Sequence, residues 1–439
     1  MSSRKKAFVY GTAILTMTGL ISRLIGFFYK IFLAQTIGAA KIGIFQMIAP
    51  IYTLALAICV GGMSTVMARM IAAAAASREK TGEWKLLFCG TCSCTALALT
   101  ISILLHVFSE KIARYYFHDC SHADILRILS WSIVPATIHS CLMSIYYARK
   151  KAICPSIAQL LEQTVRVLSS MLIYMLFRSR NQLPDATLPA ISLLFGELAS
   201  CQYSLLCILG ESKKPSKIRN LFSGFRVNAK SLFVTALPLT ANRISLMLLH
   251  SIEAILIPRQ LQLGGATSQE AFTVYGVFAG MALPMILFPN TLANAASVML
   301  LPGVAEDQAK GNHSSIKNTT KAATILCLLV GICAAIFFFL FGKHLGLLLF
   351  HNLQAGLFLQ ILSFISPFLY LNATLSGILH GLGKTGSSFI INSSGLIIRI
   401  LFVLFAIPVF GIRGYLYGIL ASELLSCLMT VLFLRPYYR

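Results

Sequence analysis

AATILCLLVGICAAIFFFLF, residues 322–341, contains no Asp, Glu, Lys or Arg in 20 consecutive positions. An α-helix rises 1.5 Å per residue, so a helix of this length spans the roughly 30 Å hydrocarbon core of a bilayer. Residues 86–108 form a second run of this kind. Both runs are too long to be strands, and the sequence therefore predicts helices that cross a membrane.

The composition extends this prediction to the whole chain. Of the 439 residues, 57% are hydrophobic and 11% are charged, and the mean hydropathy is +0.79. A soluble domain carries about 25% charged residues, so the chain is expected to be a polytopic membrane protein. We expect an all-α fold with about 12 spanning helices, near residues 8–34, 43–68, 86–108, 125–148, 153–177, 188–209, 231–257, 272–299, 322–341, 355–379, 388–410 and 412–434.

The net charge of +22 is explained by membrane topology. Counted over alternate loops, 22 of the 36 Lys and Arg residues lie on the side of the N-terminus and nine lie on the opposite side. Cytoplasmic loops of membrane proteins carry the excess of Lys and Arg. We therefore expect both termini in the cytoplasm, and the charge implies no nucleic-acid partner.

The chain is predicted to consist of two similar halves. The polar, basic stretch 211–230 is interpreted as a cytoplasmic linker between an N-terminal six-helix lobe, 1–210, and a C-terminal six-helix lobe, 231–439. An even number of helices gives both copies the same orientation, as in transporters with parallel repeats, so a substrate path would lie in a central cavity between pseudo-symmetric lobes. The separation of Pro135 from Arg166 nearly equals that of Pro367 from Arg399, and ELASC at 197–201 matches ELLSC at 423–427.

Five basic side chains lie within the apolar spans: Arg23, Lys30, Arg166, Arg243 and Arg399. A charge at this depth costs at least ~2.5–3.5 kcal/mol, so it is retained where it faces protein, water or a ligand. The ligand that basic side chains favour is an anion. These residues are therefore the main clue to function.

Three motifs give the chain a specific resemblance. SRLIGFFYK at 22–30 opens the first helix, YGVFAGMALP at 275–284 lies in the eighth, and GILHGLGK at 377–384 follows the tenth. In this order and spacing they resemble the stage V sporulation protein B and polysaccharide flippase branch of the multidrug/oligosaccharidyl-lipid/polysaccharide exporter superfamily. The lipid II flippases are a related branch and share the pattern at Ser22 to Phe27.

The resemblance implies a V-shaped bundle in the bacterial cytoplasmic membrane that moves a lipid-linked saccharide, a polysaccharide or peptidoglycan precursor, by alternating access. Implied partners are this anionic lipid, membrane lipids, and polysaccharide or cell-wall synthesis enzymes, with a link to sporulation. No catalytic residue and no cofactor are expected, and the coupling ion, sodium or proton, is left open. The chain departs from the lipid II flippases after Pro50, where residues 51–56 are uncharged and those flippases carry basic and acidic residues. Its sequence predicts twelve helices, whereas many family members have fourteen.

A lipid diphosphate headgroup carries concentrated negative charge, and Arg or Lys facing a wet cavity supplies charge-assisted hydrogen bonds to it. Arg23 and Arg243 begin the two lobes and are the first candidates for headgroup binding. Lys30 follows Arg23 by two helical turns on nearly the same face, or else it snorkels to the interface. Arg399 lacks a local acid, because Gly395 lies four residues before it, and needs a partner from another helix or a ligand.

The acids in the spans divide into a local pair and a distant candidate. Glu162 and Arg166 are i, i+4 neighbours and are predicted to form a structural pair. Glu253 lies about three turns after Arg243 near the outer end of its helix, where it is a candidate gate or coupling residue or one half of an interhelix pair. Prolines in spans remove backbone donors, and Pro238, Pro284 and Pro289 are candidate hinges.

Two clusters of metal-ligating residue types are interpreted without a metal. Cys89, Cys92 and Cys94 lack a second cluster, so they are read as helix-packing residues. His118, Asp119, His122 and Asp124 in an outer loop are read as solubilising groups, with zinc as the alternative.

Two other functions compete with the flippase. A cation-coupled multidrug exporter of the same superfamily needs carboxylates for cationic drugs, whereas the first helix offers Arg23 and Lys30 and no acid. A membrane glycosyltransferase or polymerase needs positioned carboxylates in an outer loop, and the outer acids are few and scattered. The sequence therefore favours a transporter over an enzyme.

Overall fold

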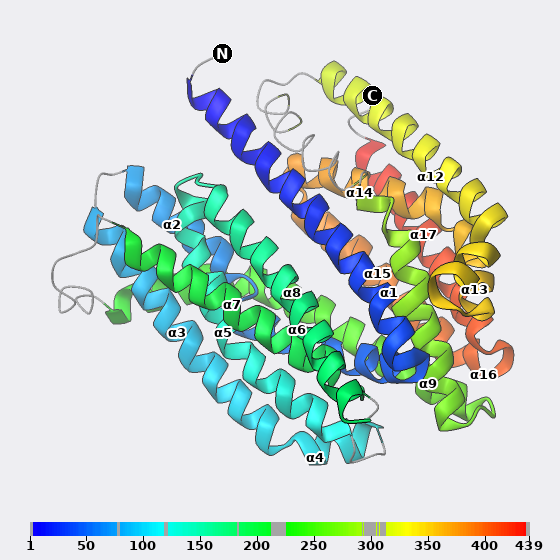
Figure 1. Ribbon diagram of the computed structural model, residues 1–439. Coiled ribbons are helices and arrows are strands. Elements are labelled where there is room, and N and C mark those ends of the chain that lie inside the picture. Colours follow the sequence, from blue (N-terminus) through cyan, green and yellow to red (C-terminus); the bar gives the residue numbers. More distant parts are fainter. Residues whose placement is uncertain are drawn as a thin grey trace. The chain divides into compact units, whose positions relative to one another are not determined.

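The protein is helical wherever its structure is described. The computed structural model describes residues 3–76, 80–117, 122–181, 184–211, 225–291, 293, 304, 307 and 313–435. All secondary-structure elements in these ranges are helices, and none is a strand (Figure 1). This is the all-α membrane fold that the composition predicts.

The first half of the chain contains α1 to α7 and the start of α8. The bounds are α1 Ser3–Val60, α2 Met63–Ala76, α3 Lys80–Val107, α4 Ser109–Ile112, the π-helix η1 Ala113–Phe117, α5 Ala123–Ala148, α6 Ile153–Ser179, α7 Leu188–Gly210 and α8 Phe225–Leu263. Within α1, Gly38 has non-helical backbone angles (φ 79°, ψ 168°), so α1 is two helices in sequence. A left-handed φ of this kind favours glycine, which has no Cβ.

The second half contains shorter, more interrupted helices. The bounds are α9 Ser268–Gly276, the π-helix η4 Val277–Ala282, α10 Leu283–Leu287, α12 His313–Phe350, α13 Leu353–Ser363, α14 Ser366–Gly381, α15 Thr385–Phe405, α16 Ile407–Phe410 and α17 Ile412–Leu434. The predicted eighth span, 272–299, is described only to residue 291, with residue 293 beyond it.

The helices are long and apolar enough for about twelve crossings. Ten helices of the described ranges qualify as candidate spans, or eleven if the bent pair α13 and α14 counts as one. The first candidate, Thr16–Ala75, has 60 residues and includes the break at Gly38. At 1.5 Å per residue it covers about 90 Å, enough for two crossings. The chain is a multi-pass membrane protein.

One predicted span is not a single helix. Residues 355–379 were expected to form one helix, but α13 ends at Ser363 and α14 begins at Ser366 with a bend of 60°. Pro367 explains the break, because a proline ring clashes with the carbonyl group one helical turn earlier and so interrupts a continuous helix. The tenth span is therefore a broken helix.

The described structure divides into two compact units. Unit 1 comprises Met1–Gly26 and Ile48–Ser251, and unit 2 comprises Phe27–Met47 and Ile252–Arg439. This differs from the predicted boundaries at residues 210 and 231, because the border falls within α8 and part of α1 is assigned to unit 2. Most of the predicted linker, 212–224, lies outside the described residues. The division into six-helix lobes stays a prediction.

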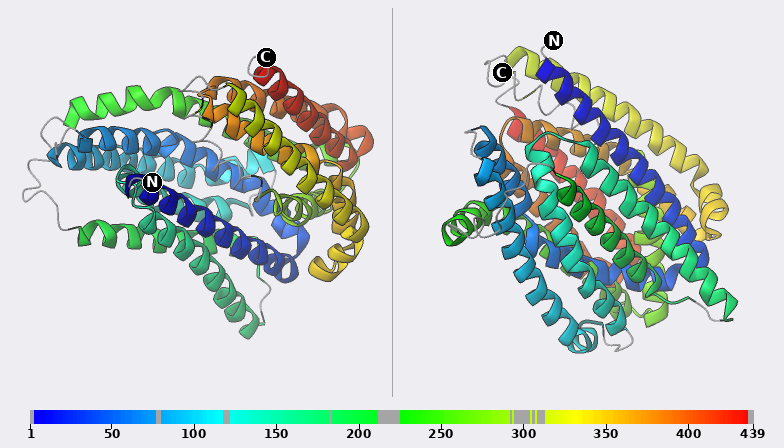
Figure 2. Two further views of the ribbon diagram at one scale, coloured as in Figure 1. Left: turned by 90° about the horizontal axis from the view of Figure 1, so that it is seen from above. Right: turned by 60° about the vertical axis from the view of Figure 1, so that its left-hand side comes forward.

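The two units share an order of helix packing. In unit 1, α3 packs on α5, α5 on α7, and α6 on α7 (Figures 1 and 2). In unit 2, α12 packs on α14, α14 on α17, and α15 on α17. If the halves are repeats, these are corresponding pairs, so the packing supports the predicted internal repeat.

Small residues set the closest helix approach in unit 2. A Cβ added to Gly43 of α1 would lie 2.0 Å from the carbonyl oxygen of Phe272, and one added to Gly276 would lie 1.9 Å from that of Ala39. Glycine pairs of this kind let membrane helices approach at backbone contact. This contact explains why residues 27–47 are assigned to unit 2.

Candidate functional site: paired and unpaired intramembrane charges

Arg166 lies in a buried cluster of unit 1. Its Nη2 lies 2.5 Å from Glu162 Oε1, one turn earlier on α6. The i, i+4 spacing brings the two side chains together, as predicted from the sequence. Glu197 on α7 lies 3.9 Å from the same nitrogen, and Tyr52 of α1 donates a hydrogen bond of 3.1 Å to Glu197 Oε1.

This cluster has no excess of positive charge. Two carboxylates surround one guanidinium, and Glu197 and Tyr52 are only 8% and 5% exposed. Arg166 is therefore neutralised within unit 1, and a second anion would meet repulsion from the carboxylates. The arrangement supports a structural role.

Arg399 lies in a corresponding cluster of unit 2. Its Nε lies 2.9 Å from Glu253 Oε1, and its Nη2 donates to Glu253 Oε2 at 3.2 Å. Tyr415 of α17 donates a second hydrogen bond to the Glu253 carboxylate, of 2.9 Å to Oε1, and its ring meets Phe278 edge to face. The acid that Arg399 lacks on its own helix comes from α8.

This pair bears on two predicted roles. Arg399 was expected to need a distant partner or a ligand, and Glu253 is that partner. Glu253 is 5% exposed and holds both Arg399 and Tyr415. The roles of Arg399 in substrate binding and of Glu253 as a gate or coupling residue stay predictions.

Arg23 and Arg243 differ from these paired arginines. Both are exposed, and neither forms a hydrogen bond or ion pair with another residue of the described ranges. Arg23 follows the buried Ser22 on α1, and Gly26, one turn later, approaches Gln163 of α6. Among the residues that the structure describes, neither guanidinium group is neutralised by an acid.

Lys30 is half-buried and also makes no ion pair within the described ranges. It belongs to the part of α1 that is assigned to unit 2, whereas Arg23 belongs to unit 1. Its neighbour Tyr29 is 8% exposed. Lys30 thus remains a candidate ligand next to a packed residue.

The predicted hinges occupy different backbone settings. Pro284 lies in α10 directly after the π-helix η4, and Pro289 lies in the turn that ends α10. A π-helix and a proline are both known causes of helix bending. Pro238 lies inside α8, whose bounds continue past it. The hinge roles of all three stay predictions.

Two polar cavities were not anticipated from the sequence. One, of about 230 Å³ in unit 2, includes Asn372, Ser388, Asn392 and Glu423 in its lining, and Asn372 Nδ2 donates to Glu423 Oε2 at 2.7 Å. Side-chain oxygens of this kind are the ligands of hard cations. The other cavity lies in unit 1 and includes His139. The only sequence signal for either cavity is the presence of polar residues scattered along apolar helices.

Neither predicted metal alternative forms a site in the described ranges. No group of three or more His, Cys, Asp or Glu side chains there could hold a metal ion. Cys89 and Cys94 are buried, whereas Cys92 is exposed. His118 and Asp119 lie outside the described residues, and Asp124 instead pairs with Arg127 at 2.9 Å.

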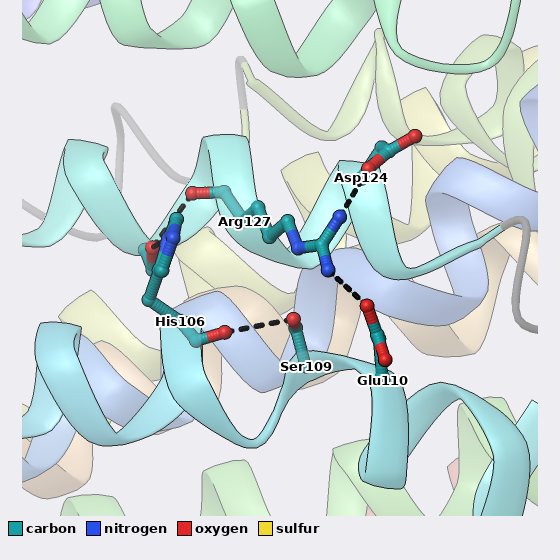
Figure 3. A network of polar contacts seen from close by, with 6 residues as sticks. His106, Ser109, Glu110, Asp124 and Arg127 are labelled. Carbon is teal, nitrogen blue, oxygen red and sulfur yellow. Dashed lines mark hydrogen bonds and ion pairs between the residues drawn. The ribbon is translucent and has the colours of Figure 1, made fainter.

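Figure 3 shows the polar network at the corner between α3 and α5. Arg127 binds both Asp124 and Glu110, and Ser109 donates a 2.8 Å hydrogen bond to the carbonyl of His106. The two carboxylates are more than 60% exposed, so these are surface ion pairs. They join the helix ends and leave the Arg127 guanidinium paired with two acids.

Comparison with known proteins decides the family. Residues 8–306 match the family model described as polysaccharide biosynthesis protein. The chain belongs to this family. Residues 260–405 also match the MatE model. Stage V sporulation protein B of Bacillus subtilis is 25% identical over 432 residues, which cover 97% of this chain and 83% of that protein.

Two solved structures show the same fold for this family member. An inward-facing MATE family transporter of the MOP superfamily has a TM-score of 0.77 at 14% identity and covers 94% of each chain. Lipid II flippase MurJ, in an inward closed conformation, has a TM-score of 0.75 at 15% identity and covers 96% of this chain and 87% of its own. These likenesses show that the chain has the fold that the two solved structures share.

Proposed function

We propose that this protein is a flippase that moves an anionic lipid-linked saccharide across the bacterial cytoplasmic membrane by alternating access. The carrying observation is the contrast among its arginines. Arg166 and Arg399 are neutralised by glutamates, whereas Arg23 and Arg243 are exposed and have no acid partner in the described ranges. Unpaired guanidinium groups in apolar helices suit an anionic cargo.

The chemistry of a lipid diphosphate fits these groups. Its headgroup loses water when it enters the membrane region, and each guanidinium can replace that water with two parallel charge-assisted hydrogen bonds. A pair of arginines balances most of the charge of a diphosphate. Lys30 would add a third, point-like charge without the bidentate geometry.

Cation-coupled multidrug export is the second candidate, because the fold is shared with a MATE family transporter and residues 260–405 match the MatE model. Glu423 favours it, since in the described ranges its carboxylate accepts a hydrogen bond from the Asn372 amide rather than from an arginine. Glu162, Glu197 and Glu253, in contrast, are held by arginines or tyrosines. Positive charge thus dominates the unpaired groups, which favours the flippase.

The orientation follows from the loop charges. We place both termini in the cytoplasm and expect contacts with polysaccharide or cell-wall synthesis enzymes on that side. In a cysteine-free background, a single cysteine at Ser314 should resist an impermeant thiol reagent in intact cells, and one at Gln182 should react. Labelling of Ser314 from outside would reverse the orientation.

A binding titration tests the proposal with polyprenyl diphosphate and purified full-length protein. Each contact to phosphate contributes on the order of 1.5–3 kcal/mol, so Arg23→Ala should weaken binding roughly ten- to a hundredfold. Arg23→Lys should restore only part of this loss. Arg178→Ala, which changes an exposed arginine at the end of α6, is the matched control and should bind like the wild type.

Two results would argue against the proposal. If Arg23→Ala and Arg243→Ala proteins bind polyprenyl diphosphate as tightly as the wild type, the headgroup does not use these residues. If the wild type binds a cationic dye and no lipid diphosphate, the drug-export alternative is favoured.

A further inference from the structure

A polar cleft in unit 1 takes no part in the two arginine clusters. It has a volume of about 350 Å³ and is lined by residues of α2 and α5: Ser64, Thr65, Ala68, His139, Ser140, Met143 and Tyr147. Five of these seven side chains are polar, and none is an acid, Lys or Arg. The exposed lining is more apolar than polar, and the polar side chains within it can hydrogen-bond to water or to a ligand.

The hydroxyl groups of the cleft are unused. Ser64, Thr65, Ser140 and Tyr147 form no side-chain hydrogen bond to another residue of the described ranges. Elsewhere on α5, in contrast, Ser132 and Ser144 donate to backbone carbonyls of the preceding turn. The cleft thus presents hydroxyl groups that can both donate to and accept from a ligand.

His139 adds an acceptor. The hydroxyl of Ser204 donates to the carbonyl of Ser200 at 2.6 Å, so its oxygen accepts from His139 Nδ1 at 2.7 Å. With the proton on Nδ1, the other ring nitrogen, Nε2, carries a lone pair in the neutral imidazole. A neutral acceptor beside several hydroxyl groups matches a ligand with hydroxyl groups of its own.

Tyr147 supplies an aromatic surface. Tyr147 lines the cleft and is 52% exposed, and an aromatic ring has an electron-rich face that suits the C–H groups of a sugar ring. The cleft volume is at the lower end of the roughly 300–1,000 Å³ range of ligand pockets, which suits one or two sugar rings. Because the lining has no cationic Lys or Arg, the cleft is unsuited to phosphate.

We infer that this cleft binds a neutral sugar ring of the transported lipid-linked saccharide. The inference rests on the proposed function, since it assigns the sugar end of the cargo while Arg23 and Arg243 take the diphosphate. The lining residues belong to the ends of the predicted spans 43–68 and 125–148, both of which point to the predicted cytoplasmic side. A precursor made in the cytoplasm would meet this cleft first.

Saturation-transfer difference NMR tests the sugar site without the lipid. The probes are the neutral methyl glycosides of N-acetylglucosamine, glucose, galactose and mannose, added at millimolar concentration to the full-length protein in detergent. At least one should receive saturation from the wild type. Thr65→Val and Tyr147→Leu should each weaken its apparent affinity about tenfold.

A matched control separates the cleft from general effects. Thr100→Val removes an exposed threonine hydroxyl on α3, one that donates to the carbonyl of Ala96 outside the cleft, and should bind like the wild type. No saturation of any glycoside, or equal affinity in both cleft variants, would overturn the sugar site. Neither result would affect binding of polyprenyl diphosphate, and loss of that binding in turn leaves the glycoside experiment intact.

Discussion

The largely buried guanidinium groups of Arg166 and Arg399 are neutralised in two different ways. Arg166 is neutralised by Glu162 on its own helix, with Glu197 and Tyr52 completing the cluster in unit 1. Arg399 is neutralised from a different helix, by Glu253. In each cluster a tyrosine hydroxyl binds the interhelix glutamate. In both clusters a glutamate lies against the arginine, but it comes from the same helix in unit 1 and from another helix in unit 2.

Packing explains the difference. Gly395 occupies, relative to Arg399, the position that Glu162 occupies relative to Arg166. A Cβ there would lie 2.9 Å from Ser426 Oγ, so a larger side chain at this position of α15 would have to displace the Ser426 hydroxyl. The acid comes instead from another helix, α8. In unit 1 two carboxylates lie within 4 Å of Arg166, whereas in the described part of unit 2 Glu253 is the close partner of Arg399 and Glu423 acts on it from farther away.

The largest effect is expected where the acid closest to Arg399 is lost. Glu253→Gln leaves the Arg399 guanidinium largely buried without its close counter-charge, which should cost about 3–5 kcal/mol of stability. Thermal unfolding of the purified protein measures this loss. The double variant Glu253→Gln, Arg399→Met should recover most of the lost stability. A Glu253→Gln protein as stable as the wild type would show that the ion pair does not stabilise the fold.

The next effect concerns Gly395. Gly395→Ala should destabilise unit 2 by about 1–3 kcal/mol, because the added methyl group meets Ser426. Gly386→Ala, on the same helix with nothing within 4 Å of the added Cβ, is the control and should be neutral or stabilising. Equal unfolding temperatures for the two variants would contradict the packing explanation.

A smaller effect is expected in unit 1. Glu197→Gln removes one of two acids and leaves the Arg166–Glu162 pair intact, and the amide oxygen can still accept from Tyr52. The change in unfolding free energy should stay within about 1 kcal/mol. A loss as large as that of Glu253→Gln would mean that Glu197 is the principal counter-charge of Arg166.

The smallest effect is expected at the exposed network of Figure 3. Arg127→Ala removes surface ion pairs with Glu110 and Asp124, which water and salt already screen. The unfolding temperature should not change measurably at physiological salt. A clear destabilisation that persists at high salt would show that these pairs act as a buried network does.

The sequence predicts the fold well because the signals are local. Apolar runs of 20 residues set the spans, and the i, i+4 spacing sets the Glu162–Arg166 pair. The break between Ser363 and Ser366 was missed, although Pro367 marks it, because prolines are often tolerated in membrane helices.

The sites were predictable only in part. Arg23 and Arg243 stand out as charges among apolar residues, but the partner of Arg399 depends on the packing of α8 against α15, which no spacing within one helix can show. The same holds for Tyr52, Tyr415 and the cleft around His139. Contacts between distant segments need the structure.

Translocation in proteoliposomes tests the central claim, that the unpaired arginines serve the cargo while the paired ones serve the fold. The measured quantity is the transport rate of a polyprenyl-diphosphate-linked saccharide per folded molecule, in the wild type and in Arg23→Ala, Arg243→Ala double-variant protein, with Arg178→Ala as the control. The double variant should fold normally and transport at least about tenfold more slowly. A normalised rate equal to that of the wild type would contradict the claim.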